Sequence, residues 1–143
     1  MQSIQDVMQE IGSDMAFLDD MAKIEYLVDI SKKAPGLPPE LKDEQHKVYG
    51  CASETWINVE EKDDKIFITS DSDTAIVRGL LQLLERSFNG HTKEEIIAVD
   101  GQQVLNTIGL GGSITNRRMN GFASAIAKIQ RIVGEMIQPK VDG

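Results

Sequence analysis

The sequence is poor in the residue types that several classes of protein depend on. It has one cysteine, Cys51, so the chain can form no internal disulfide and no thiolate-rich zinc site. Aromatic residues make up 5% of the 143 residues. No apolar run approaches the roughly 20 residues of a membrane-spanning helix, and no basic segment followed by an apolar one opens the chain. A cytoplasmic location, where thiols stay reduced, is therefore expected.

Basic residues are also scarce, with 15 Lys and Arg against 23 Asp and Glu and a net charge of −8. Nucleic acids and anionic membranes are bound mainly through Lys and Arg, so neither is expected as a partner. Hydrophobic residues at 41% and the chain length fit a single globular domain over residues 1–143. Within it, residues 1–18 are expected to form an N-terminal helix and link, and residues 139–143 a tail.

Apolar residues at helical spacing predict most of the secondary structure. The expected helices cover residues 4–12, 19–33, 75–88, 92–97 and 115–136. Gly12-Ser13 is expected to end the first, and Met21 and Leu27 to lie on the buried side of the second. Asp71 or Asp73 is expected to cap the third helix. The fourth has a capping box, with Thr92 as the cap and Glu95 three residues later.

A period of two replaces the helical period between residues 48 and 70. Strands are predicted at 55–59 and 65–69 with a turn at 60–64, and 48–49 is a shorter strand candidate. Residues 104–110 are apolar, and the glycines at 109, 111 and 112 predict a mobile loop. The expected fold is α+β, with a small antiparallel sheet packed against helices.

Cys51 lies in the loop before the predicted hairpin, where two interpretations stay open. It is either a small buried hydrophobic residue or a nucleophile that accepts and passes on a group. Gly50 allows a tight turn that presents the thiol, and Tyr49 and Trp56 are candidates to form the walls of an apolar pocket around it. The nearby His46 and the distant His91 are expected to be solvated, so neither a metal site nor a Cys–His protease pair is favoured.

Two further patterns bear on anion chemistry. Residues 109–112 (Gly-Leu-Gly-Gly) precede a helix but lack the Lys-Ser/Thr ending of a phosphate loop, so a hinge is the better interpretation. Arg117 and Arg118 stand at the start of the last helix, the end where the helix dipole disfavours cations. Their position hints that an anion, or a thiolate, comes near.

Three ordered motifs give the chain a family resemblance, which covers residues 26 to 132. Residues 50–56 (Gly-Cys-Ala-Ser-Glu-Thr-Trp) resemble the Gly-Cys-Gln-Ser-x-Val-Trp motif of the SufE family. Residues 70–80 are similar to its Asp-Ser-Asp-Ala-x-Ile-Val-x-Gly-Leu segment. Residues 118–122, after the Ile-Gly-Leu of 108–110, resemble its Leu-Gly-Leu followed by Arg-x-x-Gly-Leu.

The sequence departs from these motifs at several positions. Ala52 stands where the family has Gln, Thr55 where it has Val, and Tyr49 where Pro is frequent. Ser113 and Asn116 replace a common His and Pro. The thiol itself is kept, so the departures concern its secondary contacts and the choice of partner.

The resemblance implies a sulfur-acceptor protein of iron–sulfur cluster assembly with a SufE-like fold, which is also similar to that of IscU-type scaffolds. Cys51 would take persulfide sulfur from a SufS-type cysteine desulfurase, stimulate it, and pass the sulfur to a SufB-containing scaffold. Pyridoxal phosphate would belong to the desulfurase, so this chain would need no cofactor or metal and would not turn over alone. The resemblance places these residues at the partner-binding site: Gly50, Ser53, Trp56, Asp71, Asp73 and Gly121.

Two hypotheses concern the thiol. A free thiol has a pKa of about 8.5 and is only a few per cent ionised at neutral pH. Arg118 or the partner's site is therefore expected to favour the thiolate. In the free protein, Cys51 is expected to tuck beneath the loop of residues 109–112 and to swing out on docking.

Other functions and assemblies remain as alternatives. One is a non-catalytic adaptor that binds a desulfurase while Cys51 is buried and inert, and another is a freestanding thiol enzyme. Monomer and homodimer are both left open.

Overall fold

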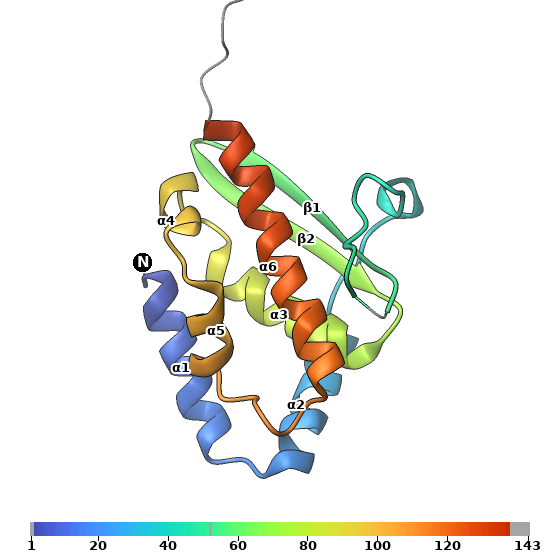
Figure 1. Ribbon diagram of the computed structural model, residues 1–143, viewed down its shortest axis with the longest axis vertical. Helices are drawn as coiled ribbons and strands as arrows, with labels where there is room; N and C mark the ends of the chain where they lie inside the picture. Colours follow the sequence, from blue (N-terminus) through green and yellow to red (C-terminus); the bar gives the residue numbers. More distant parts are fainter. Residues whose placement is uncertain (1, 52, 138–143) are drawn as a thin grey trace, which may run out of the picture.

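The structure is a computed structural model that describes residues 2–51 and 53–137 (Figure 1). Six α-helices, one short 3-10 helix and a two-stranded sheet make up this part of the chain. In chain order they are α1 (Ile4–Ala16), α2 (Asp20–Lys32), η1 (Pro39–Leu41), β1 (Thr55–Lys62), β2 (Lys65–Ser72), α3 (Ala75–Phe88), α4 (Lys93–Ile97), α5 (Gly101–Thr107) and α6 (Asn116–Ile137). The α+β prediction is confirmed.

The strands β1 and β2 form an antiparallel hairpin whose register runs from Thr55 opposite Ser72 to Lys62 opposite Lys65. The turn is shorter than the predicted 60–64, because only Asp63 and Asp64 lie outside the ladder. Both have positive φ, 54° and 62°, as in the two-residue turns that match the twist of a hairpin. Strand β1 therefore ends at Lys62, three residues beyond its predicted end at residue 59.

One face of the hairpin meets the helices and the other faces outward. Ile57, Ile66 and Ile68 are almost fully buried, whereas Phe67 on the opposite face is 40% exposed. Helix α3 packs on β2 and α6 packs on β1, and Figure 1 shows α6 lying across the hairpin. Each buried aliphatic side chain contributes about 1.5–3 kcal/mol, so this shared core fixes the position of α6.

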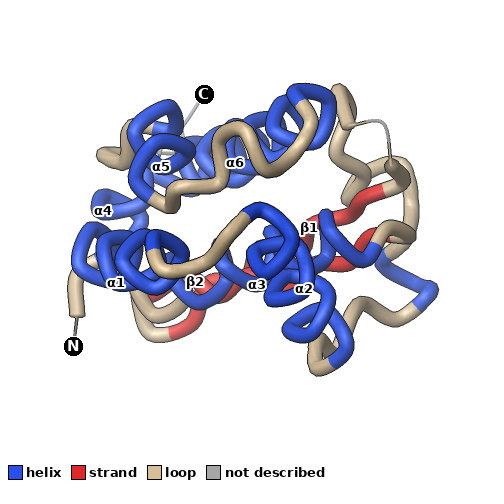
Figure 2. The backbone as a smooth tube through the Cα atoms, turned by 90° about the horizontal axis from the view of Figure 1, so that it is seen from below, coloured by secondary structure: helices blue, strands red, loops and turns tan. Residues whose placement is uncertain are grey.

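The remaining helices extend the core away from the hairpin. Helix α2 packs on α3, while α1 contacts α3 and α5, and α4 and α5 contact α6. Figure 2 shows α5 and α6 along one side of the molecule and α1 and α3 along the other, with the strands passing behind α3 in this view. No helix in the described part of the chain is long and apolar enough to cross a membrane.

Three helix predictions were wrong in detail. Helix α1 continues past Gly12-Ser13 to Ala16, because Gly12 serves close packing: a Cβ there would lie 2.1 Å from the Thr107 carbonyl oxygen. Residues 101–107 form α5, not part of a loop, and Asp100 caps it. Met21 is 71% exposed, so α2 buries Leu27 without it.

The predicted caps met different outcomes. Thr92 with Glu95 forms the predicted capping box at α4, and Ser3 with Asp6 forms a second one at α1. At α3 the prediction was wrong, because the N-cap is Thr74 and its side chain makes no capping bond. The predicted tail at 139–143 lies outside the described residues.

Candidate functional site

Cys51 is half-buried, in a loop that passes along one face of α6. We name residues 45–51 and 53 the Cys51 loop. A Cβ added to Gly121 of α6 would lie 2.7 Å from Cys51 Sγ, so only glycine permits this approach. Gly50 has a φ of +91°, and a Cβ there would lie 2.8 Å from Ser124 Oγ. The helix therefore covers the thiol from one side.

Contacts on either side of Cys51 show that the loop and α6 run in opposite directions. Lys128 Nζ donates to the Gln45 carbonyl oxygen at 3.1 Å, and Ser53 lines a cavity together with Arg117 and Arg118. The helix residues of these contacts are spaced by three or four, so they lie on one face of α6. They are 117, 121, 124 and 128. Figure 2 shows the loop beside the N-terminal end of α6.

The cover of the thiol differs from the one expected. The predicted shelter beneath residues 109–112 was wrong, because the sulfur contacts Gly121 and Thr55 while Gly111 and Gly112 face open space. The predicted aromatic walls were also wrong. Tyr49 is 63% exposed, and Trp56 points to the opposite side of β1 from Thr55, which contacts the sulfur.

A line of buried hydroxyl groups leads from the sulfur to the start of α3. Thr55 Oγ1 lies 3.4 Å from Cys51 Sγ and 3.1 Å from Ser72 Oγ. Ser72 Oγ in turn accepts from the backbone N–H of Thr74 at 3.3 Å. The Thr55 hydroxyl also donates to the Ser53 carbonyl oxygen at 3.3 Å, so its one proton has two acceptors in reach, and an anionic sulfur would compete for it with a neutral carbonyl. Thr55 and Ser72 are 1% and 2% exposed, so water competes little for these bonds.

Two arginines lie next to the Cys51 loop, on the side of Ser53. Arg117, Arg118, Ser53 and Thr115 line a cavity of about 400 Å³. Arg118 is half-buried and Arg117 exposed. The sequence placed Arg118 near the thiolate, and the structure brings it to the cavity lined by Ser53, two residues after Cys51. An anion in this cavity would meet two guanidinium groups and the N-terminal end of α6.

Asp71 lies on the other face of the hairpin, at the centre of a charge cluster. Its carboxylate is 3.0 Å from Lys42 Nζ and 3.3 Å from Arg78 Nε, and accepts from the backbone N–H of Leu37 at 3.1 Å. Lys42 also lies 5.4 Å from the centre of the Trp56 ring. Asp71 is 8% exposed, so these bonds give it a structural role. Its part in partner binding stays a prediction.

The pKa of Asp71 is lowered. Burial acts to raise this pKa, but hydrogen bonds from Lys42 and from the backbone N–H groups of Leu37 and Ser72 outweigh it. A carboxyl with a lower pKa in the folded state stabilises the fold above its unfolded pKa of about 3.9. This stabilisation is lost as the pH falls further, through the folded pKa.

We expect Asp71→Asn to lower the free energy of unfolding at pH 7 by about 3 kcal/mol, because it leaves two cations without their charged partner. Urea unfolding at pH 7 and pH 3 measures this, and the difference from wild type should shrink at pH 3. Asp29→Asn is the matched control, since Asp29 pairs with Lys32 at 4.0 Å on the open surface. It should cost less than about 0.5 kcal/mol. Equal losses in the two variants would contradict the structural role.

The other predicted residues have different surroundings. Asp73 accepts from the Thr74 hydroxyl at 3.1 Å, and its own N–H donates to the Glu54 carbonyl at 3.1 Å, which ties the start of α3 to the Cys51 side of β1. His91, expected to be solvated, is 4% exposed and lies 3.0 Å from Glu95. Among residues 2–51 and 53–137, no cluster of three or more His, Cys, Asp or Glu side chains could hold a metal ion.

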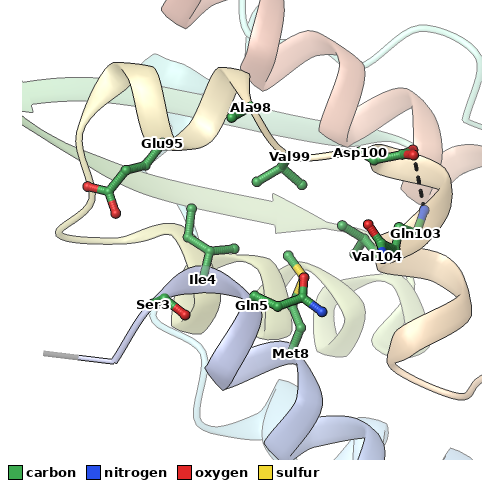
Figure 3. A pocket seen from close by; sticks show the side chains of 10 residues that line it. All are labelled: Ser3, Ile4, Gln5, Met8, Glu95, Ala98, Val99, Asp100, Gln103 and Val104. Atoms are coloured by element: carbon green, nitrogen blue, oxygen red, sulfur yellow. Dashed lines mark hydrogen bonds between the residues drawn. The ribbon is translucent and has the colours of Figure 1, made fainter.

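A second cavity of about 320 Å³ lies between α1, α4 and α5, away from the elements that hold Cys51 (Figure 3). Ile4, Met8 and Val104 give it an apolar floor. Its acidic groups already serve the helix ends, since Asp100 caps α5 and Glu95 completes the capping box of α4. The cavity is therefore separate from the thiol chemistry.

Sequence reasoning missed the parts of the site that come from distant segments. Thr55 was noted only as a departure from the family motif, although its hydroxyl is the polar neighbour of the sulfur. Ser124, Lys128 and Arg131 were seen only as residues of a long helix. Their spacing of four and three residues was the available signal, because it places polar and basic groups on the face that also carries Gly121.

Comparison with known proteins gives a consistent family. The family model SufE, described as "Fe-S metabolism associated domain", matches residues 9–133. An uncharacterized SufE-like protein of Rhizobium etli is 31% identical over 128 residues, 86% of each chain. Another, of Synechocystis, is 33% identical over 112 residues, 78% of this chain and 70% of the relative.

Two further matches extend the comparison. A chloroplastic quinolinate synthase of Nicotiana tabacum is 25% identical over 125 residues, which make up 85% of this chain but 17% of that protein. The solution structure of a hypothetical protein from Thermus thermophilus shares the fold, with a TM-score of 0.73 at 19% identity over 90% of this chain and 94% of the other. Because the family match spans most of the residues, the chain belongs to the SufE family of domains associated with iron–sulfur metabolism.

Proposed function

We propose that the protein accepts persulfide sulfur on Cys51 from a pyridoxal-phosphate-dependent cysteine desulfurase and passes it on for iron–sulfur cluster assembly. The observation that carries this proposal is the placement of a single half-buried thiol beside a hydroxyl donor and an arginine-lined cavity. The family's association with iron–sulfur metabolism gives the chemistry its setting.

In the proposed step, the Cys51 thiolate attacks the outer sulfur of the desulfurase persulfide. A sulfur–sulfur bond forms to Cys51 Sγ while the bond within the donor persulfide breaks. The donor cysteine leaves as a thiolate, and the transferred sulfur keeps its proton, so no external oxidant or reductant is required. Cys51 then carries the persulfide to an acceptor, for which a SufB-containing scaffold is the candidate.

The surroundings of Cys51 support each requirement of this step. In this proposal the Thr55 hydroxyl turns from the Ser53 carbonyl to donate to the anionic sulfur before attack, and Arg118 adds positive potential on the side of Ser53. The exposed side of the thiol leaves an approach for the donor. The expected result is a protein that speeds a desulfurase but releases no sulfide from cysteine by itself.

Intact-protein mass spectrometry tests the proposal after incubation with cysteine and a SufS-type desulfurase of demonstrated activity. The chain should gain one or more sulfur atoms that a reductant removes, and peptide mapping should place them on Cys51. An unmodified chain after many desulfurase turnovers would contradict the proposal and favour an adaptor with an inert thiol.

Thr55→Val removes the hydroxyl while keeping the shape of the side chain. A hydrogen bond to a charged acceptor contributes about 1.5 kcal/mol, so sulfur acceptance at neutral pH should slow about tenfold. Single-turnover transfer from a preloaded desulfurase measures this rate between pH 6 and 9.

Two variants complete that test. Thr69→Val makes the same change at an exposed position of β2 and should leave the rate unchanged. Arg118→Ala should slow acceptance in the same direction as Thr55→Val. If Thr55→Val or Arg118→Ala matches the wild-type rate across the whole pH range, the substituted residue has no part in the mechanism.

A further inference from the structure

The charged side chains around Cys51 are mostly basic, although the chain as a whole is acidic. The net charge is −8, yet five cations lie in or beside the Cys51 loop. Two of them, Arg117 and Arg118, line the cavity shared with Ser53. The others, Lys47, Lys128 and Arg131, line a cavity of about 280 Å³ together with Tyr49 and Ser124. We name these five residues the basic rim.

The basic rim is not neutralised from within the chain. In the described ranges, 2–51 and 53–137, none of its five side chains has a carboxylate partner within 4.0 Å. Elsewhere the same residue types are paired, as Arg86 is with Glu10 at 3.2 Å and Lys93 with Glu61. Arg78 pairs with Asp71 in the same way, so the three arginines of the described ranges that lack a carboxylate partner all belong to the basic rim. Four lysines elsewhere in these ranges also lack one: Lys23, Lys33, Lys62 and Lys65.

Crowding of these cations has a cost that a partner would relieve. Burial and the positive charge of Arg131 lower the pKa of Lys128. Glu135, which lines a cavity together with these two residues, only partly opposes this lowering. Tyr49 adds an exposed aromatic ring to the same surface, with Lys47 Nζ 5.7 Å from its centre. Arginine and tyrosine are enriched in protein interfaces, and like charges without counterions favour an acidic partner.

The geometry also fixes where such a partner would sit. Arg117, Ser124, Lys128 and Arg131 share the face of α6 that carries Gly121, the residue against Cys51. Arg117 and Arg118 lie at the start of α6. Lys128 and Arg131 lie further along it with Lys47 of the loop beside them, so Cys51 lies between the two groups. A surface that binds both groups at once would place its own reactive sulfur above Cys51.

We infer that the basic rim is the docking surface for an acidic patch around the active-site opening of the desulfurase, and that this pairing sets the affinity and orientation of sulfur transfer. The inference rests on the proposed function and adds the chemistry of the partner surface. It accounts for binding, whereas Thr55 acts on the reactivity of the thiol and Arg118 belongs to both. Charge pairing of this kind steers association and weakens as salt rises.

The test measures initial rates of desulfurase-driven sulfur loading against the concentration of this chain, from 20 to about 300 mM KCl, a range over which screening strengthens. For wild type, KM should rise with salt while kcat stays constant. The double variant Lys47→Glu/Arg131→Glu, with one change on the loop and one on α6, should raise KM at least about tenfold at low salt. Its KM should also lose most of its salt dependence.

A matched control separates docking from net charge. Lys62→Glu/Lys65→Glu makes the same change of charge at an exposed cross-strand pair beside the hairpin turn, and its KM should stay within about twofold of wild type. Equal increases in KM in both double variants, or a wild-type KM that ignores salt, would overturn the inference. The milder Lys47→Gln/Arg131→Gln should give an intermediate KM.

A chemical sulfur donor separates this inference from the proposed function. Sodium tetrasulfide needs no docking surface. At about 300 mM KCl, where its own negative charge is screened, it should load Cys51 of the Glu double variant at about the wild-type rate, which also shows that the loop is intact. If wild type takes no sulfur from the desulfurase, the proposed function fails. If wild type is loaded but charge reversal leaves KM unchanged, only the docking inference fails.

Discussion

Cys51→Ser is expected to abolish sulfur loading completely. Serine keeps the size and the hydrogen-bonding geometry next to Thr55, but its hydroxyl is not ionised at neutral pH and forms no persulfide. The intact mass should therefore stay constant after incubation with cysteine and an active desulfurase. The desulfurase should also lose its stimulation, because its own persulfide is no longer cleared.

The same variant separates the sulfur acceptor from an adaptor. An adaptor with an inert thiol would still bind and stimulate the desulfurase after Cys51→Ser. Binding should persist in both cases, since the basic rim is unchanged, so stimulation of cysteine turnover is the decisive readout. Full stimulation by the serine variant would contradict the acceptor role.

Gly121→Ala is expected to have the second largest effect on sulfur transfer. The new methyl group would lie 2.7 Å from Cys51 Sγ and 3.3 Å from Cys51 Cβ, so the loop must move away from α6. A displacement of about 1 Å at a reacting group can cost about 100-fold in rate, and we expect a loss of that order. Single-turnover sulfur loading measures it.

The exposure of the thiol should change in the opposite direction. Once the loop has left α6, iodoacetamide should alkylate Cys51 several-fold faster in Gly121→Ala than in wild type. A slower transfer together with a faster alkylation would show that the thiol is intact but misplaced. Unchanged rates in both assays would show that the glycine contact has no part in positioning Cys51.

Gly134→Ala is the matched control on the same helix. A Cβ there would meet Ile97 Cδ1 at 3.6 Å, which is an ordinary contact. Alanine should stabilise the helix by about 0.5–1 kcal/mol and leave sulfur loading unchanged. The two variants have the same gain in helix propensity, so any difference between them reports the contact with Cys51.

Periodicity was sufficient for the elements with strong apolar patterns and failed where packing decided. The hairpin and α6 were predicted because Ile57, Ile68 and Ile129 recur at the spacing of their elements. Helix α5 was missed because it buries only Val104 within a polar and glycine-rich segment. Gly12 looked like a helix end because its real reason, the Thr107 carbonyl, lies on another helix.

For the site, too, local patterns identified residues but did not predict the contacts between distant segments. Cys51 and Gly121 were singled out by family motifs, which carry no distances. The contact between them joins residues far apart in the sequence, and no local pattern predicts such an approach. Asp71 was assigned to a helix cap because its spacing fits one, whereas its partners Lys42 and Leu37 come from the connection after α2.

The contact between the Cys51 loop and α6 also has a consequence for biosynthesis. The loop and the hairpin leave the ribosome well before Gly121, so the thiol has no cover until α6 has been made and has docked. During that interval Cys51 is open to oxidants and to disulfide formation with other chains. The exposure of Cys51 to oxidants is therefore greatest before the last helix has docked and has covered one side of the thiol.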